Sequence, residues 1–200
     1  MTARQQWGVV GLVIAILAVG LGAASHFMKD QLFPVTIGST APDFKAKELG
    51  SNNYKTLADY KGQVVVLNIW ATWCEPCKQE LPSLEKLEQA YGPKGLKLIG
   101  LSADKAVSED SIKKFAEHYG LSYEILHDPT GSVEQAYQTT GYPETFVIGR
   151  EGSIRKKFIG ADDWNSEGNR ALIAQLLGLP TPRPTVDTVD APAKAVLGHP

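Results

Sequence analysis

Two hydrophobic periods alternate along the middle of the chain. Residues 64–69 (VVVLNI) and residues 96–101 (LKLIGL) are nearly continuous apolar runs, which are typical of buried central strands. The segment between them carries apolar residues near helical spacing, at Leu81, Leu84, Leu87 and Tyr91. The pattern therefore predicts a strand, a helix and a second strand in succession.

The rest of the body continues this alternation. Strands are predicted over residues 123–126, 145–148 and 153–159, and helices over residues 108–119, 132–139 and 168–177. Ser108 can cap the first of these helices and Gly120 ends it, while residues 149–152 form the turn of a closing hairpin. The order predicts an α/β sandwich with a central mixed sheet and helices on both faces.

An uncharged apolar segment precedes this body. No Asp, Glu, Lys or Arg occurs between Arg4 and Lys29, and residues 8–24 approach the roughly 17–25 apolar residues that cross a bilayer. The alternative is a cleaved signal peptide, because residues 22–24 are small, but the apolar region of such peptides usually runs about 7–15 residues. We therefore expect a membrane anchor over residues 1–28.

The charges that flank the anchor predict its orientation. The amino terminus and Arg4 precede it, whereas Lys29 beyond it is offset by Asp30. Because positive charge stays on the cytoplasmic side, the body is expected outside the bacterial cytoplasmic membrane. That compartment is oxidising, so a neighbouring pair of cysteines would tend to close there unless something keeps it reduced.

The chain divides into four segments. The anchor is followed by an expected stalk over residues 29–38, one domain over residues 39–179 and a disordered tail over residues 180–200, which holds five of the twelve prolines. A length of 200 residues with 43% hydrophobic residues fits one globular domain with appendages. A net charge of -2, without a cluster of Lys or Arg, argues against a nucleic-acid surface.

The chain has only two cysteines, Cys74 and Cys77. They lie where the first predicted strand ends and a helix begins, so Cys74 falls at the helix amino terminus and Cys77 one turn later on the same face. Free N–H groups and the helix dipole stabilise a thiolate there. Cys74 is therefore the predicted exposed nucleophile, and the shielded Cys77 is the thiol that resolves the mixed disulfide. Pro76 stiffens the turn between them.

Three other uses of the two sulfurs compete with a redox role. A structural disulfide across so short a loop would add little stability, because the entropic gain rises with loop length. A zinc site needs four ligands, and the histidines are scattered singly, at His26, His118, His127 and His199. Two inert, buried cysteines fit the composition alone, but their place between strand and helix argues against them.

Three motifs connect the chain to a known family. They are Ala41-Pro42-Asp43-Phe44, the stretch 67–77 (LNIWATWCEPC) and residues 141–148 (GYPETFVI). With these motifs the body resembles the thioredoxin-like proteins and, among them, the membrane-anchored ResA/TlpA/CcmG group of extracytoplasmic thiol–disulfide reductases. The resemblance implies a thioredoxin-like sandwich, with a central mixed sheet flanked by helices and preceded by an N-terminal transmembrane helix.

The resemblance also implies roles for single residues. Pro143 corresponds to a cis-proline that faces the dithiol, and Pro82 to the proline that kinks the active-site helix. With Pro143 in cis, the backbone of Tyr142 can pair with an extended substrate segment. Three residues around the dithiol complete the expected substrate-binding set: Trp73, Glu75 and Pro76.

One position departs from the pattern of many thioredoxins, which carry a buried aspartate in the strand before the active site. Here that residue is Asn68, which cannot take the proton of the inner thiol. Glu80, three residues after Cys77 and so on the same helix face, is the expected catalytic substitute, as in ResA-type proteins. The alternative for Glu80 is a solvated surface charge. Glu75 is either solvated or raises the pKa of Cys74 by like-charge repulsion.

The expected function is reduction of protein disulfides outside the membrane. The resemblance implies that the substrate is the oxidised Cys-x-x-Cys-His motif of apocytochrome c and that a transmembrane dithiol carrier supplies the electrons. No bound cofactor or metal is expected, because the dithiol is itself the redox group. Since nearby carboxylates oppose the helix dipole, we expect the pair to act as a reductant.

Three rival functions would use the same residues. A peroxiredoxin of the AhpC/TSA type has a similar fold and entry motif, but its Pro-x-x-x-Thr-x-x-Cys signature is missing here. An oxidase that forms disulfides would need a more positive redox potential. A non-enzymatic metal-binding or chaperone module would use the sulfurs as ligands.

Overall fold

The computed structural model describes residues 3–27 and 35–181, and within residues 3–27 it describes the side chains of Trp7 and residues 11–22. Most of the predicted stalk and nearly all of the predicted tail fall in residues 28–34 and 182–200. Those two predictions therefore lie largely outside the described residues.

The described chain alternates strands and helices as the sequence predicts. The elements of its first half are α1 (Ala3–Phe27), β1 (Lys45–Glu48), β2 (Tyr54–Thr56), the 3-10 helix η1 (Leu57–Tyr60), β3 (Val64–Trp70), α3 (Glu75–Tyr91), the 3-10 helix η2 (Gly92–Lys94) and β4 (Leu96–Ser102). Those of its second half are α4 (Glu109–His118), β5 (Glu124–His127), α5 (Ser132–Tyr137), β6 (Glu144–Ile148), β7 (Ile154–Ile159) and α6 (Glu167–Leu177).

The strands form one mixed sheet in the order β2-β1-β5-β4-β3-β6-β7. β3, β4 and β5 run parallel, whereas β1, β2, β6 and β7 are attached antiparallel to their neighbours. All seven residues of the central strand β3 are buried, which explains its continuous apolar run. The predicted α/β sandwich with a mixed sheet is confirmed.

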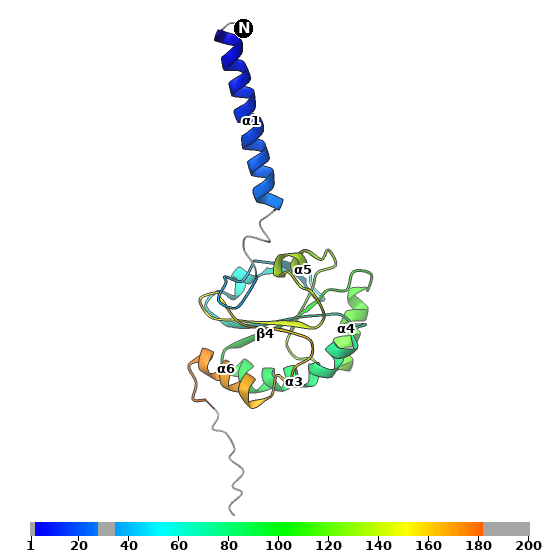
Figure 1. Ribbon diagram of the computed structural model, residues 1–200. Helices are drawn as coiled ribbons and strands as arrows, with labels where there is room; N and C mark the ends of the chain where they lie inside the picture. The colour runs from blue at the N-terminus through cyan, green and yellow to red at the C-terminus, as the bar shows by residue number, and fades with distance from the viewer. Residues whose placement is uncertain (1–2, 28–34, 182–200) are drawn as a thin grey trace, which may run out of the picture.

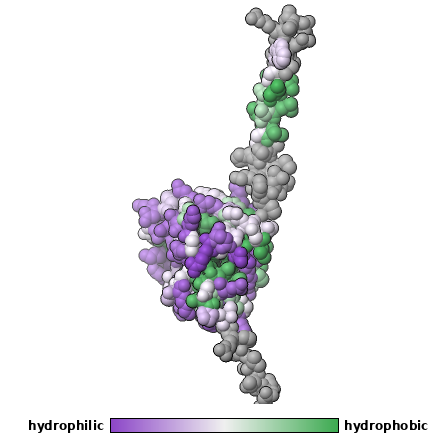
Figure 2. All heavy atoms as spheres, turned by 90° about the vertical axis from the view of Figure 1, so that its left-hand side faces the viewer, coloured by the Kyte–Doolittle hydropathy of each residue, from purple (hydrophilic) through white to green (hydrophobic). Residues whose placement is uncertain are grey.

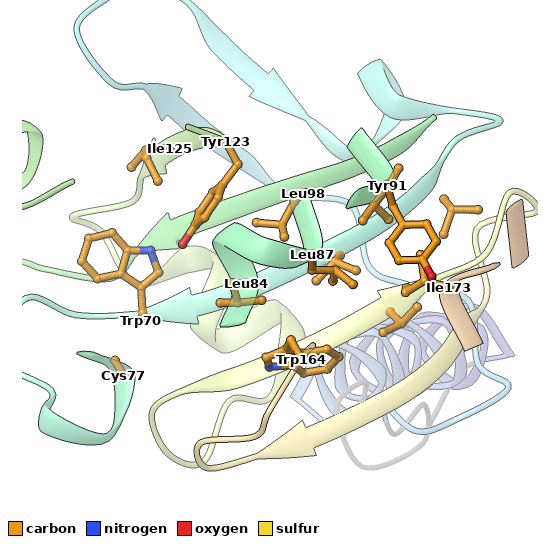
Figure 3. Packing of buried hydrophobic residues seen from close by; sticks show 14 of the residues in the cluster. Trp70, Cys77, Leu84, Leu87, Tyr91, Leu98, Tyr123, Ile125, Trp164 and Ile173 are labelled. Carbon is orange, nitrogen blue, oxygen red and sulfur yellow. The ribbon is translucent and has the colours of Figure 1, made fainter. Parts of the chain in front are cut away.

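Helices cover both faces of the sheet (Figure 1). One core cluster packs α3, α4 and α6 against the sheet, through buried residues such as Leu84, Ile112 and Ile173. Figure 3 shows this cluster, with Cys77 near Trp70 at one end. A second cluster lies under α5, around Tyr137 and other buried residues of the opposite face. The dithiol therefore borders the first core.

The predicted helix ends can be compared with the observed ones, and one agrees while another differs. Ser108 caps α4, since its hydroxyl accepts a hydrogen bond from the Ser111 amide at 3.3 Å. α5 ends at Tyr137 rather than at the predicted residue 139, because Gln138 adopts a left-handed conformation with φ 52°. Such a residue ends a helix by turning the chain away from it.

Two short strands were missed by the sequence patterns. β1 has four residues, two of them lysine, and β2 has three, of which one is lysine. They pair with each other at one edge of the sheet, and β1 also pairs with β5. Segments this short carry too little hydrophobic alternation to indicate a strand, so their pairing is set by the tertiary structure.

The amino-terminal residues form a single helix, α1. Its residues 11–22 are all exposed, and Figure 2 shows them as a mainly hydrophobic band. Within the described part of the chain, no helix combines the length and the apolar composition needed to cross a membrane. The anchor expected over residues 1–28 is not confirmed and stays a prediction.

Candidate active site

The two cysteines lie at the start of α3, where β3 ends. Cys74 occupies the N-cap position, and its Sγ accepts a hydrogen bond from the backbone N–H of Cys77 at 3.1 Å. The two residues form a disulfide, with Cα atoms 5.3 Å apart, so the structure shows the oxidised form. A backbone N–H in the first turn of a helix stabilises negative charge, so the Cys77 N–H would face a thiolate on Cys74 after reduction.

The two cysteines differ in how much of each residue is exposed to solvent, although the difference is smaller than the sequence suggests. Cys74 is 4% exposed, whereas Cys77 is completely buried. The expectation that Cys74 is well exposed is wrong for this oxidised state, because its sulfur is bonded to Cys77 and directed toward the first helical turn. Of the two residues only Cys74 keeps any exposed surface, so we expect an attacking thiolate to approach the disulfide from the Cys74 side.

The turn that carries Cys74 is held by a buried carboxylate. Asp104, which follows β4, accepts hydrogen bonds from the backbone N–H of Thr72 at 3.0 Å and from its hydroxyl at 2.9 Å. The hydroxyl of Ser102 donates to the same carboxylate at 2.8 Å. These bonds tie the residues before Cys74 to the neighbouring strand. Asp104 therefore helps to hold the active-site turn in place.

Glu80 lies inside the protein, one helical turn after Cys77. Its side chain is 2% exposed, and three donors surround its carboxylate. Asn68 Nδ2 donates to Oε1 at 2.6 Å, while Trp164 Nε1 and the amide of Asp162 donate to Oε2 at 3.2 and 3.3 Å. The alternative of a solvated surface charge at Glu80 is thereby excluded.

The surroundings of Glu80 shift its pKa toward neutral pH. Burial raises the pKa of Glu80 to about 7, and the hydrogen bonds from Asp162, Asn68 and Trp164 only partly offset this effect. A carboxyl group with a pKa near the working pH can both take and release a proton, as general acid–base catalysis requires. It lies on the helix face that carries Cys77.

Asn68 joins the helix to the far side of the site. Besides Glu80, its Nδ2 contacts the hydroxyl of Thr145 at 2.8 Å, and the two residues are paired across β3 and β6. Thr145 follows Pro143 by two residues, so one amide connects the carboxylate of α3 with the strand that carries the proline. The amide thus links α3 to β6, at the strand position where many thioredoxins carry an aspartate.

The loop before β6 brings Pro143 and Tyr142 to the site. The Tyr142–Pro143 peptide bond is cis, the geometry that the family resemblance implies. The carbonyl of Pro143 accepts a hydrogen bond from the amide of Gly160 at 2.7 Å. Among the described residues, the backbone N–H and C=O of Tyr142 have no hydrogen-bond partner. They are the polar backbone groups that an extended peptide could pair with.

Three more predicted residues surround the dithiol at the surface. Trp73 is 66% exposed, and its ring lies edge-on to that of Tyr142, with centroids 5.6 Å apart. Pro76 is exposed in the first turn of α3. Glu75 is also exposed and pairs with Lys78 at 2.9 Å, so its charge is partly neutralised. The structure thus gathers the eight predicted site residues in one region, while their roles in the reaction stay predictions.

The sequence patterns missed the residues that hold the site from a distance. Asp104 and Trp164 contact the active-site turn and Glu80 from other parts of the chain. The sequence offers one signal for Asp104, since it directly follows a predicted parallel strand, and the carboxyl ends of such strands gather functional groups. No comparable signal exists for Trp164.

Within the described parts of the chain, no group of three or more His, Cys, Asp or Glu residues is arranged to hold a metal ion. The dithiol needs none, because its two sulfurs carry the two electrons of the reaction themselves. The expected absence of a cofactor stays a prediction.

Several known proteins have sequences similar to that of this chain. A model of the AhpC/TSA family matches residues 37–157. The thiol–disulfide oxidoreductase ResA of Geobacillus thermodenitrificans is 34% identical over 160 residues, which cover 78% of this chain and 90% of that protein. ResA of Geobacillus kaustophilus is 33% identical over 149 residues, covering 74% and 83%. The thioredoxin-like protein YneN of Bacillus subtilis is 40% identical over 126 residues, covering 62% and 71%.

Solved structures with a similar fold include thiol:disulfide interchange proteins. A crystal structure from Chlorobium tepidum, named as a thiol:disulfide interchange protein DsbE, is 28% identical with a TM-score of 0.65, covering 72% of this chain and 99% of that chain. The solution structure of a thiol:disulfide interchange protein from Bacteroides sp. is 26% identical with a TM-score of 0.61, covering 72% and 91%. The chain therefore belongs to the AhpC/TSA family, has a thioredoxin-like fold and is a thiol–disulfide oxidoreductase.

Proposed function

We propose that the chain is a membrane-anchored reductase of protein disulfides that works outside the cytoplasm. The observation that carries this proposal is the buried carboxylate of Glu80, with a pKa of about 7, one turn after the resolving cysteine. A group of this kind can accept the proton that Cys77 must lose before it attacks. The arrangement assists the step in which Cys77 resolves the mixed disulfide and the reduced substrate is released.

The reaction begins with the dithiol form. The thiolate of Cys74 attacks one sulfur of the substrate disulfide, so a mixed disulfide forms and the other substrate sulfur leaves as a thiolate. Glu80 then takes the proton of Cys77, whose thiolate attacks Cys74. The substrate leaves as a dithiol once its sulfurs are protonated, and the enzyme holds the Cys74–Cys77 disulfide seen in the structure. Two electrons have passed to the substrate.

The proposed substrate is the oxidised Cys-x-x-Cys-His motif of apocytochrome c, and the proposed electron donor is a transmembrane dithiol carrier. The resemblance to the ResA/TlpA/CcmG group supports both. The free backbone of Tyr142 beside the dithiol supports a substrate that binds as an extended segment.

Reduction of an oxidised peptide with this motif tests the proposal. The wild-type chain should speed its reduction by dithiothreitol, and Cys74→Ser should abolish that effect while leaving the fold intact. The proposal fails if the wild type leaves the peptide oxidised, or if Cys74→Ser acts as fast as the wild type.

The membrane anchor belongs to the same proposal. It is supported by the absence of Asp, Glu, Lys and Arg between Arg4 and Lys29, and by the exposure of residues 11–22, which leaves an apolar helix surface in need of a partner. In bacterial cells the full-length chain should stay in the membrane after carbonate washing, with its carboxyl-terminal body open to protease from outside the cytoplasmic membrane. Release of a shortened chain would instead indicate a cleaved signal peptide.

A second candidate follows from the family name, because AhpC/TSA is also the name of the rival antioxidant enzymes. The family match alone does not separate peroxide reduction from disulfide reduction. The relatives named ResA and the Cys-x-x-Cys pair favour disulfide reduction. Peroxide consumption by the reduced wild type, measured beside reduction of the peptide disulfide, separates the two.

A further inference from the structure

Tyr142, the residue before the cis-proline, is hydrogen-bonded to a carboxylate that lies outside the dithiol site. Its hydroxyl donates a hydrogen bond to Glu134 Oε1 on α5. On the other side its ring lies edge-on to that of Trp73, the residue before Cys74. A continuous line of contacts therefore leads from α5 through Tyr142 to the turn that carries the nucleophile.

Glu134 is itself held in a fixed place. Its side chain is only 19% exposed, and its Oε2 lies 3.4 Å from Lys105 Nζ, in the loop between β4 and α4. Gly131, with φ +77°, leaves room for this pair, because a Cβ there would lie 3.1 Å from Glu134 Oε2 and 3.2 Å from Lys105 Nζ. The loop that carries Lys105 and the turn at Gly131 therefore both lie close to the carboxylate of Glu134.

The hydroxyl of Tyr142 stays protonated and so can donate this hydrogen bond. Burial and the hydrogen bond to Glu134 raise the pKa of Tyr142 above its ordinary value, so the hydroxyl keeps its proton at physiological pH. A hydrogen bond to an ionised carboxylate is about twice as strong as one between neutral groups. The contact therefore fixes the Tyr142 ring more firmly than packing against the exposed Trp73 would alone.

Other bonds hold the backbone of this loop. The amide of Thr140 donates to Glu144 Oε2 at 3.0 Å, and the carbonyl of Pro143 accepts from Gly160 at 2.7 Å. These bonds do not involve Glu134. Loss of the Glu134 contact should therefore free the Tyr142 side chain without unfolding the loop or moving the dithiol.

We propose that Glu134 is a positioning residue that acts through Tyr142 to place an extended peptide beside Cys74, and so favours protein disulfides over small ones. This inference rests on the proposed function as a protein-disulfide reductase. A peptide must align with the backbone of Tyr142 as well as reach the sulfur, whereas a small disulfide needs only the sulfur. Disturbing Tyr142 should therefore weaken peptide binding and spare the reaction with small disulfides.

Steady-state kinetics with dithiothreitol in excess test this inference on the full-length chain. The substrates are an oxidised Cys-x-x-Cys-His peptide and a small aromatic disulfide, dithiobis(nitrobenzoic acid). Glu134→Leu and Tyr142→Phe should each raise KM for the peptide about tenfold with little change in kcat, the scale expected for loss of a hydrogen bond to a charged group. For Glu134→Leu, which lies outside the dithiol site, the kcat/KM for the small disulfide should stay within about twofold of the wild type.

Three further variants make the comparison specific. Glu134→Gln keeps a neutral acceptor for the Tyr142 hydroxyl, so its KM for the peptide should lie between those of the wild type and Glu134→Leu. The double variant Glu134→Leu/Tyr142→Phe should be no worse than either single variant, because both remove the same contact. Glu117→Leu, the same substitution at an exposed position of α4, should leave both substrates unaffected. If Glu134→Leu fails to fold, the test uses Tyr142→Phe, which removes only the hydroxyl, together with Glu134→Gln.

The outcomes separate this inference from the proposed function. If the wild type reduces the peptide and the variants match it, or lose equal activity on both substrates, the role of Glu134 is overturned while the reductase proposal stands. Additive losses in the double variant also overturn it. If the wild type reduces only the small disulfide, the proposed function fails and the inference fails with it.

Discussion

Asn68 donates a 2.6 Å hydrogen bond to the carboxylate of Glu80 and so joins the central strand β3 to the active-site helix α3. Many thioredoxins, which the sequence resembles, use an aspartate in this strand. Here the strand supplies a neutral amide and the helix supplies the carboxylate. This chain therefore also has a buried titratable group beside the dithiol, but the group lies on the helix instead of the strand.

The first prediction concerns how stability depends on pH. Burial raises the pKa of Glu80 from 4.5 to about 7 in the folded protein. Between these values the folded state binds a proton that the unfolded chain has lost, so this stabilising contribution is complete below pH 4.5 and is lost as pH rises through 7. The shift corresponds to about 3 kcal/mol. Glu80→Gln should remove this pH dependence.

Urea unfolding of the disulfide form at several pH values measures the effect. The difference in unfolding free energy between Glu80→Gln and the wild type should change by about 3 kcal/mol between pH 4.5 and pH 8, in favour of the variant at high pH. Glu117→Gln, at an exposed position, should follow the wild type. Parallel curves for Glu80→Gln and the wild type would contradict a buried carboxylate with a raised pKa.

The second prediction concerns the release of substrate. Without Glu80 the thiol of Cys77 must lose its proton to water, so Glu80→Gln should slow resolution of the mixed disulfide about 100-fold at pH 7, the lower range for general-base catalysis. The defect should shrink as pH rises, because Cys77 then ionises without help. Rapid-mixing kinetics of the second step check this, and an equal loss at every pH would contradict a role in proton transfer.

The third prediction concerns the redox potential of the Cys74–Cys77 pair. Carboxylates close to the dithiol oppose thiolate formation and so stabilise the reduced, thiolate-bearing form less than in strong oxidants. We expect a potential more negative than about -200 mV, compared with about -120 mV for the oxidant DsbA. Equilibration with glutathione and thioredoxin buffers measures it. A value near that of DsbA would contradict the reductase proposal and favour an oxidase.

The fourth prediction concerns the core that supports α3. Leu84 is fully buried between α3 and the sheet (Figure 3). Leu84→Ala should destabilise the fold by about 2–5 kcal/mol, through lost apolar burial and the cavity left behind. Lys86→Ala, at an exposed position two residues away, should have little effect. Equal stabilities for the two variants in urea unfolding would show that this core is not packed as described.

The sequence is sufficient to predict the parts of the site that depend on local pattern. The apolar run of β3, the helix that follows it and the three-residue step from Cys77 to Glu80 are all local features, and each is found where the pattern predicts it. Strand and helix periodicity is set by backbone geometry, which explains why these features can be read directly.

The parts that could not be predicted depend on contacts between distant segments. Asp104 reaches Thr72 across 32 positions of the chain, and Trp164 reaches Glu80 across 84. The low exposure of Cys74 depends likewise on its disulfide and on the direction of its sulfur. None of these has a periodic signal, because each arises only when the sheet brings separate loops together.

Trapping the mixed disulfide tests the central claim, that Cys74 is the sulfur that meets the substrate. Reduced Cys77→Ser and Cys74→Ser chains are mixed with an oxidised Cys-x-x-Cys-His peptide, and the adducts are mapped by mass spectrometry. We expect a stable peptide adduct on Cys74 in Cys77→Ser and almost none on Cys77 in Cys74→Ser. An adduct that forms equally well on Cys77, or none on Cys74, would contradict it.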